Sequence, residues 1–273
     1  MQICLNIKKE DKSVRLKAAK PIVVRGKKLG GDKPLICFPL VGKTPEAALE
    51  EAKKAIAGSP DVIELRVDAW NFITDKHTSM KVLGDIRKLT DIPLLLTCRS
   101  HLEGGFQEVS AESRNALYKG AIEEKLVDLV DIELISGYEE IKNLKQIASP
   151  RDVYVIVSFH DFKKTPPKEV IFATIAKEIA FGGDVAKVAV MPQSIEDVLA
   201  LMSATLMARR EFPDIPLITM SMGSLGSITR IAGWLFGSDL TFAVGVASSA
   251  PGQIPAVELR EVYKLLYSLY LNE

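Results

Sequence analysis

The stretch Val185-Ala186-Lys187-Val188-Ala189-Val190-Met191-Pro192 is an apolar run interrupted by a single lysine. Side chains alternate between the two faces of a β-strand, so Lys187, Ala189 and Met191 share one face and the intervening valines share the other. Both faces are apolar, which is typical of a parallel strand that is covered on both sides. The run therefore predicts a buried strand of an α/β fold with an amine inside the protein.

Two interpretations of Lys187 follow from its burial. Desolvation disfavours the ammonium, so we expect the lysine pKa to fall from about 10.4 towards neutrality. A neutral buried amine can form a Schiff base with a ketone or an aldehyde. The alternative is a structural lysine that is ion-paired, or one at the strand end that reaches water. This strand alone leaves both interpretations open.

Length and charge narrow the class of protein. The chain has 273 residues, 47% of them hydrophobic, which is enough for one large core. The 35 basic residues balance the 35 acidic ones, so neither nucleic acid nor an anionic membrane is an expected partner. No apolar run approaches the roughly 20 residues of a membrane span, and the N-terminus is unlike a signal peptide. The three cysteines, Cys4, Cys37 and Cys98, are odd in number and lack CxxC spacing, so we expect reduced, mostly buried thiols in a cytoplasmic protein.

From Lys33 onward, apolar strands alternate with amphipathic helices. Besides the strand that holds Lys187, strands are predicted over 35–41, 62–68, 93–99, 129–134, 153–159, 216–222 and 240–244. Helices are predicted over 44–57, with Thr44 as N-cap, and over 78–89, 110–125, 138–148, 168–181, 194–210, 227–236 and 255–271. Eight strand–helix units without a linker predict a (β/α)8 TIM barrel, a single domain over residues 1–273.

Residues 1–31 precede this pattern and are predicted to be an N-terminal extension. Residues 1–7 are weakly strand-like, and residues 21–30 resemble a hairpin that turns near Gly26. Such a hairpin would be placed to plug the bottom of the barrel. An open doubly wound sheet is the alternative fold, but it would require a glycine-rich first βα turn, and residues 41–44 match neither GxGxxG nor a P-loop.

Polar residues gather at the predicted carboxyl ends of the strands, where barrel enzymes place their chemistry. They are Glu64, Arg66, Asp68, Arg99, Glu103, Asp131, Glu133, His160, Lys187, Arg230, Ser249 and Gln253. Singly, each has a structural explanation: Glu64 could pair with Arg66, and Arg99 with Asp131 or Glu133. Their convergence on one rim favours a site.

The residue types indicate a chemistry. Lys187 would attack a carbonyl and give an iminium that acidifies the adjacent C–H bond. His160, with an ordinary pKa near 6.5, is the candidate proton carrier. Arg99 and Arg230 would bind a carboxylate or acidic side chains in the pocket. The Pro- and Gly-containing loop 248–253 is predicted to act as a hydrogen-bonding lid.

No metal or added cofactor is expected. His77 and His101 have no placement at a strand end and are predicted to be surface residues. No cluster of histidine, cysteine and carboxylate has convincing metal-ligand spacing. The Schiff base would supply the polarisation that a metal otherwise provides.

Seven short motifs occur in order along the chain. They are Glu64-Leu65-Arg66-Val67-Asp68, Arg99-Ser100-x-x-Glu103-Gly104-Gly105, Asp131-Ile132-Glu133-Leu134, His160-Asp161-Phe162, Lys187-x-Ala189-Val190-Met191-Pro192, Thr219-Met220-Ser221-Met222 through Arg230, and Ser249-Ala250-Pro251-Gly252-Gln253. From about Pro34 to its end, the chain resembles the type I 3-dehydroquinate dehydratases (type I dehydroquinases). Each motif alone is weak, but seven in order are a specific match.

The resemblance implies a (β/α)8 barrel, commonly a homodimer, that dehydrates 3-dehydroquinate to 3-dehydroshikimate without a metal or cofactor. Lys187 would be the Schiff-base lysine, His160 the general acid/base, and Glu103 the residue that positions or tunes His160. The substrate carboxylate would be held by Arg230, Ser249 and Gln253. The ring hydroxyls would be bound by Glu64, Arg66 and Arg99. The supporting carboxylates would be Asp131 and Glu133, and the apolar walls Met222 and Phe242.

The chain departs from the family pattern at four positions. Cys98 stands where an aromatic residue is expected, Ala186 where proline often precedes the lysine, and Thr229 where serine is common. Phe159 replaces a smaller polar residue before the histidine, and it is the departure that could change the shape around His160. These departures concern efficiency rather than identity.

Two other functions are compatible with the residues. One is a class I Schiff-base aldolase, which would often take a phosphorylated substrate near the loops after strands seven and eight, where residues 223–226 could bind phosphate weakly. The other is a non-catalytic barrel that serves as a binding subunit. Arg230 and Gln253 suit a carboxylate better than a phosphate, and an intact lysine–histidine pair argues against a binding subunit.

Overall fold

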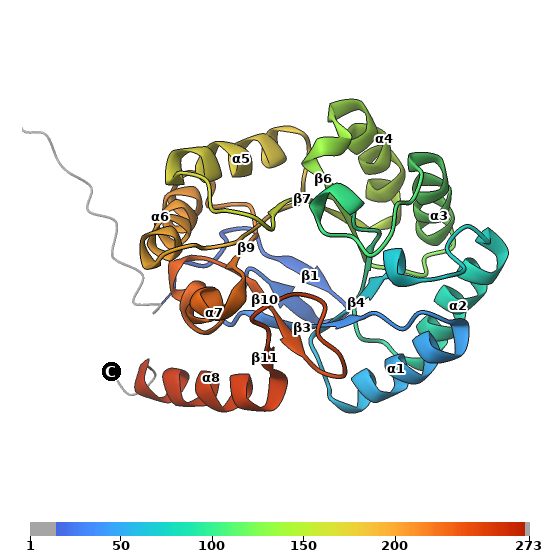
Figure 1. Ribbon diagram of the computed structural model, residues 1–273, viewed down its shortest axis with the longest axis horizontal. Coiled ribbons are helices and arrows are strands. Elements are labelled where there is room, and N and C mark those ends of the chain that lie inside the picture. Colours follow the sequence, from blue (N-terminus) through green and yellow to red (C-terminus); the bar gives the residue numbers. More distant parts are fainter. Residues whose placement is uncertain (1–14, 271–273) are drawn as a thin grey trace, which may run out of the picture.

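Eight parallel strands close into a barrel in the computed structural model, which describes residues 15–270 (Figure 1). The sheet runs in the order β11-β10-β3-β4-β5-β6-β7-β8-β9. The last barrel strand, β10, pairs with the first, β3, and β9 reaches β10 through a parallel bridge between Leu217 and Ser238. The helices surround this ring, so the predicted (β/α)8 barrel is confirmed.

The elements follow the predicted alternation. The strands are β3 (Leu35–Leu40), β4 (Val62–Arg66), β5 (Leu94–Thr97), β6 (Leu129–Glu133), β7 (Tyr154–Asp161), β8 (Val185–Val190), β9 (Leu217–Ser221), β10 (Leu240–Val244) and β11 (Ile254–Pro255). The helices are α1 (Pro45–Ala57), α2 (Lys76–Leu89), α3 (Ala111–Glu123), α4 (Tyr138–Ala148), α5 (Lys168–Ala180), α6 (Ile195–Glu211), α7 (Gly223–Ala232) and α8 (Ala256–Tyr270). The predicted cap is present, since the Thr44 side chain accepts a hydrogen bond from the Ala47 N–H.

Helix α7 begins earlier than predicted, at Gly223 rather than at residue 227. The glycines in this segment indicate a loop in the sequence, but in the structure they permit close packing. A Cβ atom on Gly226 would lie 2.4 Å from the carbonyl group of Ser221, so only glycine lets the helix sit directly on β9. The short 3-10 helix Gly233–Phe236 then completes the predicted span.

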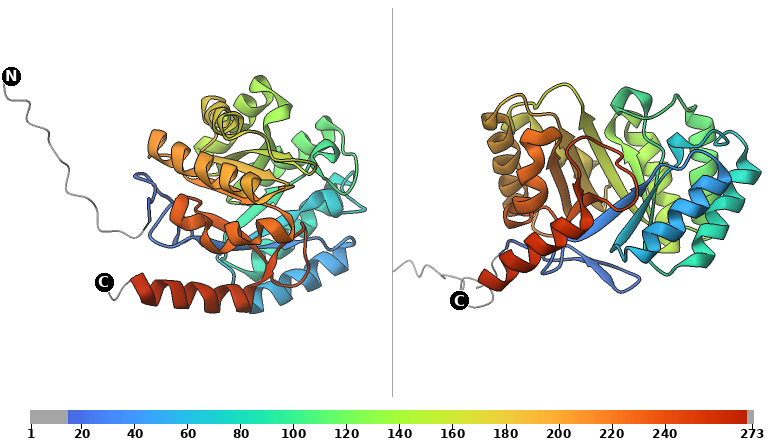
Figure 2. Two further views of the ribbon diagram at one scale, coloured as in Figure 1. Left: turned by 60° about the vertical axis from the view of Figure 1, so that its left-hand side comes forward. Right: turned by 60° about the horizontal axis from the view of Figure 1, so that its bottom comes forward.

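The N-terminal hairpin closes the bottom of the barrel. Strands β1 (Ile22–Val24) and β2 (Lys27–Leu29) pair antiparallel, and the turn uses Gly26 at a φ of +77°. Their inward side chains pack with residues from the amino ends of the barrel strands, among them Cys37, Leu95 and Ile156. Figure 2 shows the hairpin beneath the barrel. The predicted plug is confirmed; the predicted strand over 1–7 lies outside the described residues.

Strand β8 has the two-sided burial that its sequence predicts. Val188 and Val190 pack outward in a cluster with Ile175 of α5 and Leu201 of α6. Ala189 packs inward with the barrel interior. Lys187 is only 3% exposed and therefore lies inside the barrel.

Two expectations from composition concern thiols and membranes. Cys37 and Cys98 are both free and buried. Among the helices of the described residues, none combines the length and the apolar character needed to cross a membrane.

The hydroxyl of Tyr118 joins two strands where their pairing stops. It accepts a hydrogen bond from the Cys98 N–H and donates one to the Asp131 carbonyl, each at 2.7 Å, and the side chain is fully buried. Tyr118→Phe leaves both backbone groups without this partner. We expect the free energy of unfolding, measured by urea denaturation, to fall by about 1–3 kcal/mol.

The control for this prediction is Tyr138→Phe, which removes the same hydroxyl from a residue that is 46% exposed. It should stay within about 0.5 kcal/mol of the parent protein. Equal stabilities of the two variants would contradict a role for the Tyr118 bridge.

Candidate active site

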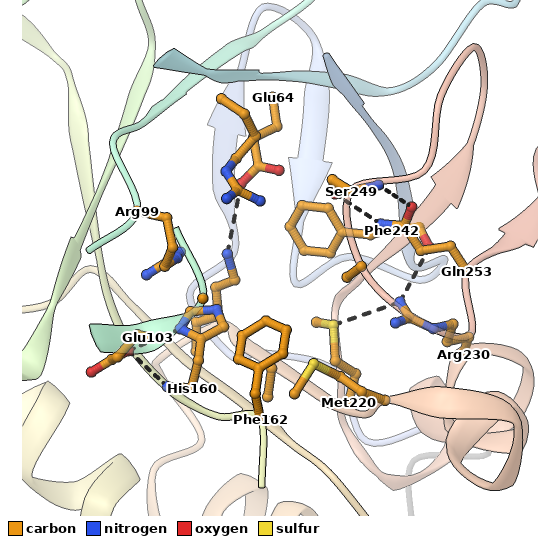
Figure 3. A pocket seen from close by; sticks show the side chains of 16 residues that line it. Glu64, Arg99, Glu103, His160, Phe162, Met220, Arg230, Phe242, Ser249 and Gln253 are labelled. Carbon is orange, nitrogen blue, oxygen red and sulfur yellow. Dashed lines mark hydrogen bonds and ion pairs between the residues drawn. The ribbon is translucent and has the colours of Figure 1, made fainter. Parts of the chain in front are cut away.

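A cavity opens at the carboxyl ends of the barrel strands (Figure 3). It holds about 450 Å³ of empty space, including the part open to solvent, which suits a small molecule. All the residues predicted to be catalytic or substrate-binding line it, and Asp131 and Glu133 lie buried behind it. Arg99 and His160 stand on one side, and Arg230, Ser249 and Gln253 stand opposite.

The Lys187 amine has an ionic partner and also faces the cavity. Its Nζ donates a hydrogen bond to Asp131 Oδ2 at 2.7 Å and lies 3.8 Å from Glu64 Oε1. The ring of Phe242 covers the amine, with its centre 4.7 Å from Nζ. The ion pair that the structural interpretation requires is therefore present, but on an amine that borders the ligand space.

Asp131 is a completely buried carboxylate with three donors. Oδ1 accepts hydrogen bonds from Arg99 Nη2 at 2.9 Å and from Ser158 Oγ at 2.6 Å, while Oδ2 accepts from Lys187. Burial alone would raise the pKa of Asp131. The positive charges of Arg99 and Lys187 outweigh burial and hold that pKa well below its ordinary value. Asp131 is therefore a fixed negative charge behind the amine.

Arg99 links the two supporting carboxylates, as the sequence allows. Its Nη1 donates to Glu133 Oε1 at 2.9 Å and to Ser158 Oγ at 2.8 Å. Burial would lower the pKa of Arg99, but the charges of Asp131 and Glu133 raise it above its ordinary value. Glu133 also accepts a hydrogen bond from the Ser100 N–H at 2.8 Å. The guanidinium is therefore permanently charged and rigidly held.

His160 and Glu103 form a pair at the cavity wall. Glu103 Oε2 lies 3.1 Å from His160 Nδ1 and accepts the His160 backbone N–H at 2.8 Å. Burial, together with the charges of Arg99 and Lys187, lowers the pKa of His160 well below 6.5. Burial also raises the pKa of Glu103 to about 8, against the opposing effect of Arg99. At pH 7 both side chains are therefore neutral. Glu103 holds the imidazole through its contact with Nδ1.

The ion pair considered for Glu64 and Arg66 is not the one formed. Arg66 instead binds both oxygens of Asp68, at 2.9 and 2.8 Å, and its guanidinium stacks on the ring of Phe106. Glu64 accepts the hydroxyl of Thr97 at 2.9 Å and faces Lys187. The reason is local geometry: the chain bends into a 3-10 turn at residues 67–69, which brings Asp68 back to the guanidinium.

Arg230 is the unusual cation of the cavity. It is 1% exposed, and no carboxylate within residues 15–270 forms a salt bridge with it. Its Nη atoms donate only to the carbonyls of Phe242 and Pro251, at 3.3 and 3.1 Å, and to the sulfur of Met220. Burial lowers the pKa of Arg230 to about 10, so it is still charged at pH 7. A buried unpaired guanidinium that lines a cavity is suited to an anionic ligand group.

The loop between β10 and β11 places two hydrogen-bonding residues beside Arg230. The Ser249 N–H donates to Gln253 Oε1 at 3.0 Å, and Gln253 Nε2 donates back to Ser249 Oγ at 3.2 Å. The short strand β11, which the sequence analysis did not predict, begins immediately after Gln253 and anchors the loop to β10. Met222, which is 1% exposed, adds an apolar wall.

The departures from the family pattern lie outside the cavity. Phe159 and Ala186 pack in the cluster between the barrel and α5–α6, so Phe159 does not fill the space around His160. Cys98 is in the core between the barrel and the helices. Thr229 Oγ1 accepts the Ser221 N–H and donates to the Gly226 carbonyl, which ties α7 to β9. Strand alternation turns Phe159 outward, away from the His160 side chain.

Several site residues were not assigned a role from the sequence. Met220, Phe162, Ala189, Gly104 and Ala250 line the cavity. Ser158 could have been found by alternation, because it precedes His160 by two positions on the same strand. His77 and His101 are exposed, as predicted. Across the described chain, His, Cys, Asp and Glu side chains do not group in threes that could hold a metal ion.

Comparison with protein families and with known sequences gives one result. The family model described as type I 3-dehydroquinase matches residues 36–270. A 3-dehydroquinate dehydratase of Geobacillus sp. (strain WCH70) is 44% identical over 249 residues, which cover 90% of this chain and 95% of that protein. The 3-dehydroquinate dehydratase of Bacillus subtilis (strain 168) is 41% identical over 247 residues, covering 90% and 97%.

Solved structures agree with these sequences. The crystal structure of 3-dehydroquinate dehydratase from Geobacillus kaustophilus HTA426 matches with a TM-score of 0.90 at 43% identity, covering 92% of this chain and 98% of that one. Type I 3-dehydroquinate dehydratase from Clostridium difficile, solved with covalently modified comenic acid, matches with a TM-score of 0.87 at 40% identity, covering 91% and 98%. The chain therefore belongs to the type I 3-dehydroquinase family, whose members are hydro-lyases.

Proposed function

We propose that this protein dehydrates 3-dehydroquinate to 3-dehydroshikimate, a step of the shikimate pathway, through a Schiff base on Lys187. The observation that supports it most is the composition of one cavity. An amine, an imidazole and an unpaired buried guanidinium all border the same space, so one small keto acid could contact all three.

The charges of the cavity give the substrate an orientation. Its carboxylate would pair with Arg230 and accept hydrogen bonds from Ser249 and Gln253. That end of the cavity offers a cation without a carboxylate partner among the described residues. The ring hydroxyls would face Glu64, Arg66 and Arg99, which offer both donors and acceptors. The C3 ketone would then lie towards Lys187.

The first chemical stage is imine formation. The Lys187 amine adds to the C3 carbonyl, and loss of one water gives an iminium. Asp131 remains ionised, so its negative charge stabilises the iminium that forms on Lys187. The iminium withdraws electrons from C2, which makes a C2 proton removable.

The second stage is elimination. His160 takes the C2 proton, and the electron pair enters the iminium to give an enamine. The enamine then expels the C1 hydroxyl, which leaves as water after His160 returns its proton. Hydrolysis of the conjugated imine consumes one water and frees Lys187, so one water is lost overall. Glu103 would hold the imidazole so that its other nitrogen faces the substrate.

One relative was solved with a covalently modified ligand. The Clostridium difficile enzyme, 40% identical to this chain, was solved with covalently modified comenic acid. A covalent ligand in a protein of the same fold and similar sequence is consistent with a reactive amine at the position of Lys187.

We also propose that the single-domain chain works in the cytoplasm as a homodimer. Apolar side chains on the outer surface of α8 are exposed, with Val257 at 72%, Leu265 at 60% and Leu269 at 58%, and such residues often mark an interface. Sedimentation velocity should give about twice the mass of one chain. A monomer at micromolar concentration would contradict this assembly.

The function is tested by turnover and by trapping. The parent protein should convert 3-dehydroquinate, followed by the absorbance of the conjugated enone product, and borohydride should trap a covalent adduct visible by mass spectrometry. Lys187→Met should lose both turnover and adduct. His160→Ala should keep the adduct but dehydrate about 10²–10⁴-fold more slowly.

The control for trapping is Lys168→Met, which removes a partly exposed lysine at the start of α5. It should behave like the parent protein. An adduct that persists in Lys187→Met would show that the amine is not the nucleophile, and a parent protein without turnover would refute the proposed function.

The pH dependence follows from the two shifted groups at the cavity wall. Because the pKa of His160 lies well below 6.5, the imidazole stays neutral and able to accept a proton as pH falls from neutral to 6.5. We therefore expect kcat/KM to decline only below pH 6.5. Above that, Glu103 loses its proton near pH 8, and its negative charge stabilises the imidazolium that forms during catalysis, so kcat/KM should rise there.

Glu103→Gln removes the second titration and should abolish the rise near pH 8 while leaving the decline below pH 6.5. A decline centred above pH 6.5 in the parent protein would contradict the proposed state of His160. Initial rates in constant-ionic-strength buffers measure both features.

A further inference from the structure

A serine that does not border the cavity connects its charged groups. Ser158 lies on β7, two positions before His160, and its side chain is completely buried. In the sheet register it stands between Glu133 of β6 and Lys187 of β8. Its hydroxyl contacts Arg99 and Asp131, so it joins the network behind the amine without facing the ligand space.

The direction of the two hydrogen bonds of Ser158 is fixed by chemistry. A guanidinium only donates, so Ser158 Oγ accepts from Arg99 Nη1 at 2.8 Å. The single hydroxyl hydrogen is then free for Asp131 Oδ1, which lies 2.6 Å away. The hydroxyl cannot reverse this arrangement, because Asp131 is ionised and offers no hydrogen.

The hydroxyl supplies a second donor to one oxygen of Asp131. Arg99 Nη2 reaches Oδ1 from one direction and Ser158 from another, at 2.9 and 2.6 Å. Two donors on Oδ1 fix the rotation of the carboxylate, which leaves Oδ2 directed at the Lys187 amine. With Arg99 alone, Oδ1 would have the single donor Nη2, because Nη1 binds Glu133, and the Asp131 carboxylate could turn about its bond to Cβ.

We propose that Ser158 is a positioning residue for Schiff-base chemistry: it holds Asp131 so that the carboxylate faces Lys187 as the amine becomes an iminium. This inference rests on the proposed function. Ser158 acts through Asp131 and does not touch substrate. Its loss should therefore slow the chemical stage more than it weakens substrate binding. The carboxylate-binding residues Arg230, Ser249 and Gln253 lie at the opposite wall, and Arg99 keeps Asp131 and Glu133 as partners.

The test is Ser158→Ala in the full-length chain with 3-dehydroquinate. We expect kcat, and the single-turnover rate of adduct formation under borohydride, each to fall about 10-fold, the factor for one hydrogen bond to a charged group. KM should stay within about 2-fold, because the groups at the carboxylate end are unchanged. Ser158→Cys replaces the hydroxyl by a weaker donor of similar size, so its rates should lie between those of the parent protein and of Ser158→Ala.

The matched control is Ser79→Ala in α2, away from the cavity, which removes the hydroxyl of a completely buried serine that donates to the Phe72 carbonyl before the helix. It should keep the parent kcat and trapping rate. Parent-like rates in Ser158→Ala, or an equal fall in Ser79→Ala, would overturn the role of Ser158 alone. A parent protein that does not turn over 3-dehydroquinate would instead overturn the proposed function.

Discussion

One buried carboxylate organises the interior of this barrel. Asp131 on β6 binds Arg99 from the end of β5, Ser158 from β7 and Lys187 from β8. A lone charge at this depth would be strongly unfavourable, and each cation would be unfavourable without it. The ends of four neighbouring strands must therefore lie at matching heights, so the strand register and the chemistry of the cavity depend on the same contacts.

The two walls of the cavity differ in whether their charged groups have partners of opposite charge. Around Asp131, every charged group has partners of opposite charge, and the network is rigid before any ligand arrives. Across the cavity, Arg230 is charged and buried but contacts only carbonyls and a sulfur. The preorganised charges around Asp131 suit stabilisation of a transition state. The wall with Arg230, whose charge has no carboxylate partner among the described residues, suits binding of an anion. Together they distinguish the reacting end of a ligand from its binding end.

Much of this could be read from the sequence. The alternation of apolar strands and helices predicted the barrel. Because barrel enzymes carry their catalytic residues at the carboxyl ends of the strands, the barrel in turn predicted which side chains share a cavity. The sequence did not predict which charged side chains pair, or where the helix after β9 begins. Arg66 binds Asp68 rather than Glu64 because of a local 3-10 turn, and the helix after β9 begins at Gly223 because Gly226 packs against the strand. Both depend on backbone path, which hydropathy does not record.

The hairpin that fills the amino end of the barrel restricts how ligands enter and leave the cavity. Because the inward side chains of the β1–β2 hairpin fill the amino end of the barrel, the cavity communicates with solvent at its carboxyl end, beside the Ser249–Gln253 loop. In the described part of the chain, residues 15–270, the packed hairpin blocks the opposite end, so a molecule that enters at the carboxyl end also leaves there. Product and substrate therefore share this opening, and product that accumulates should slow the binding of new substrate.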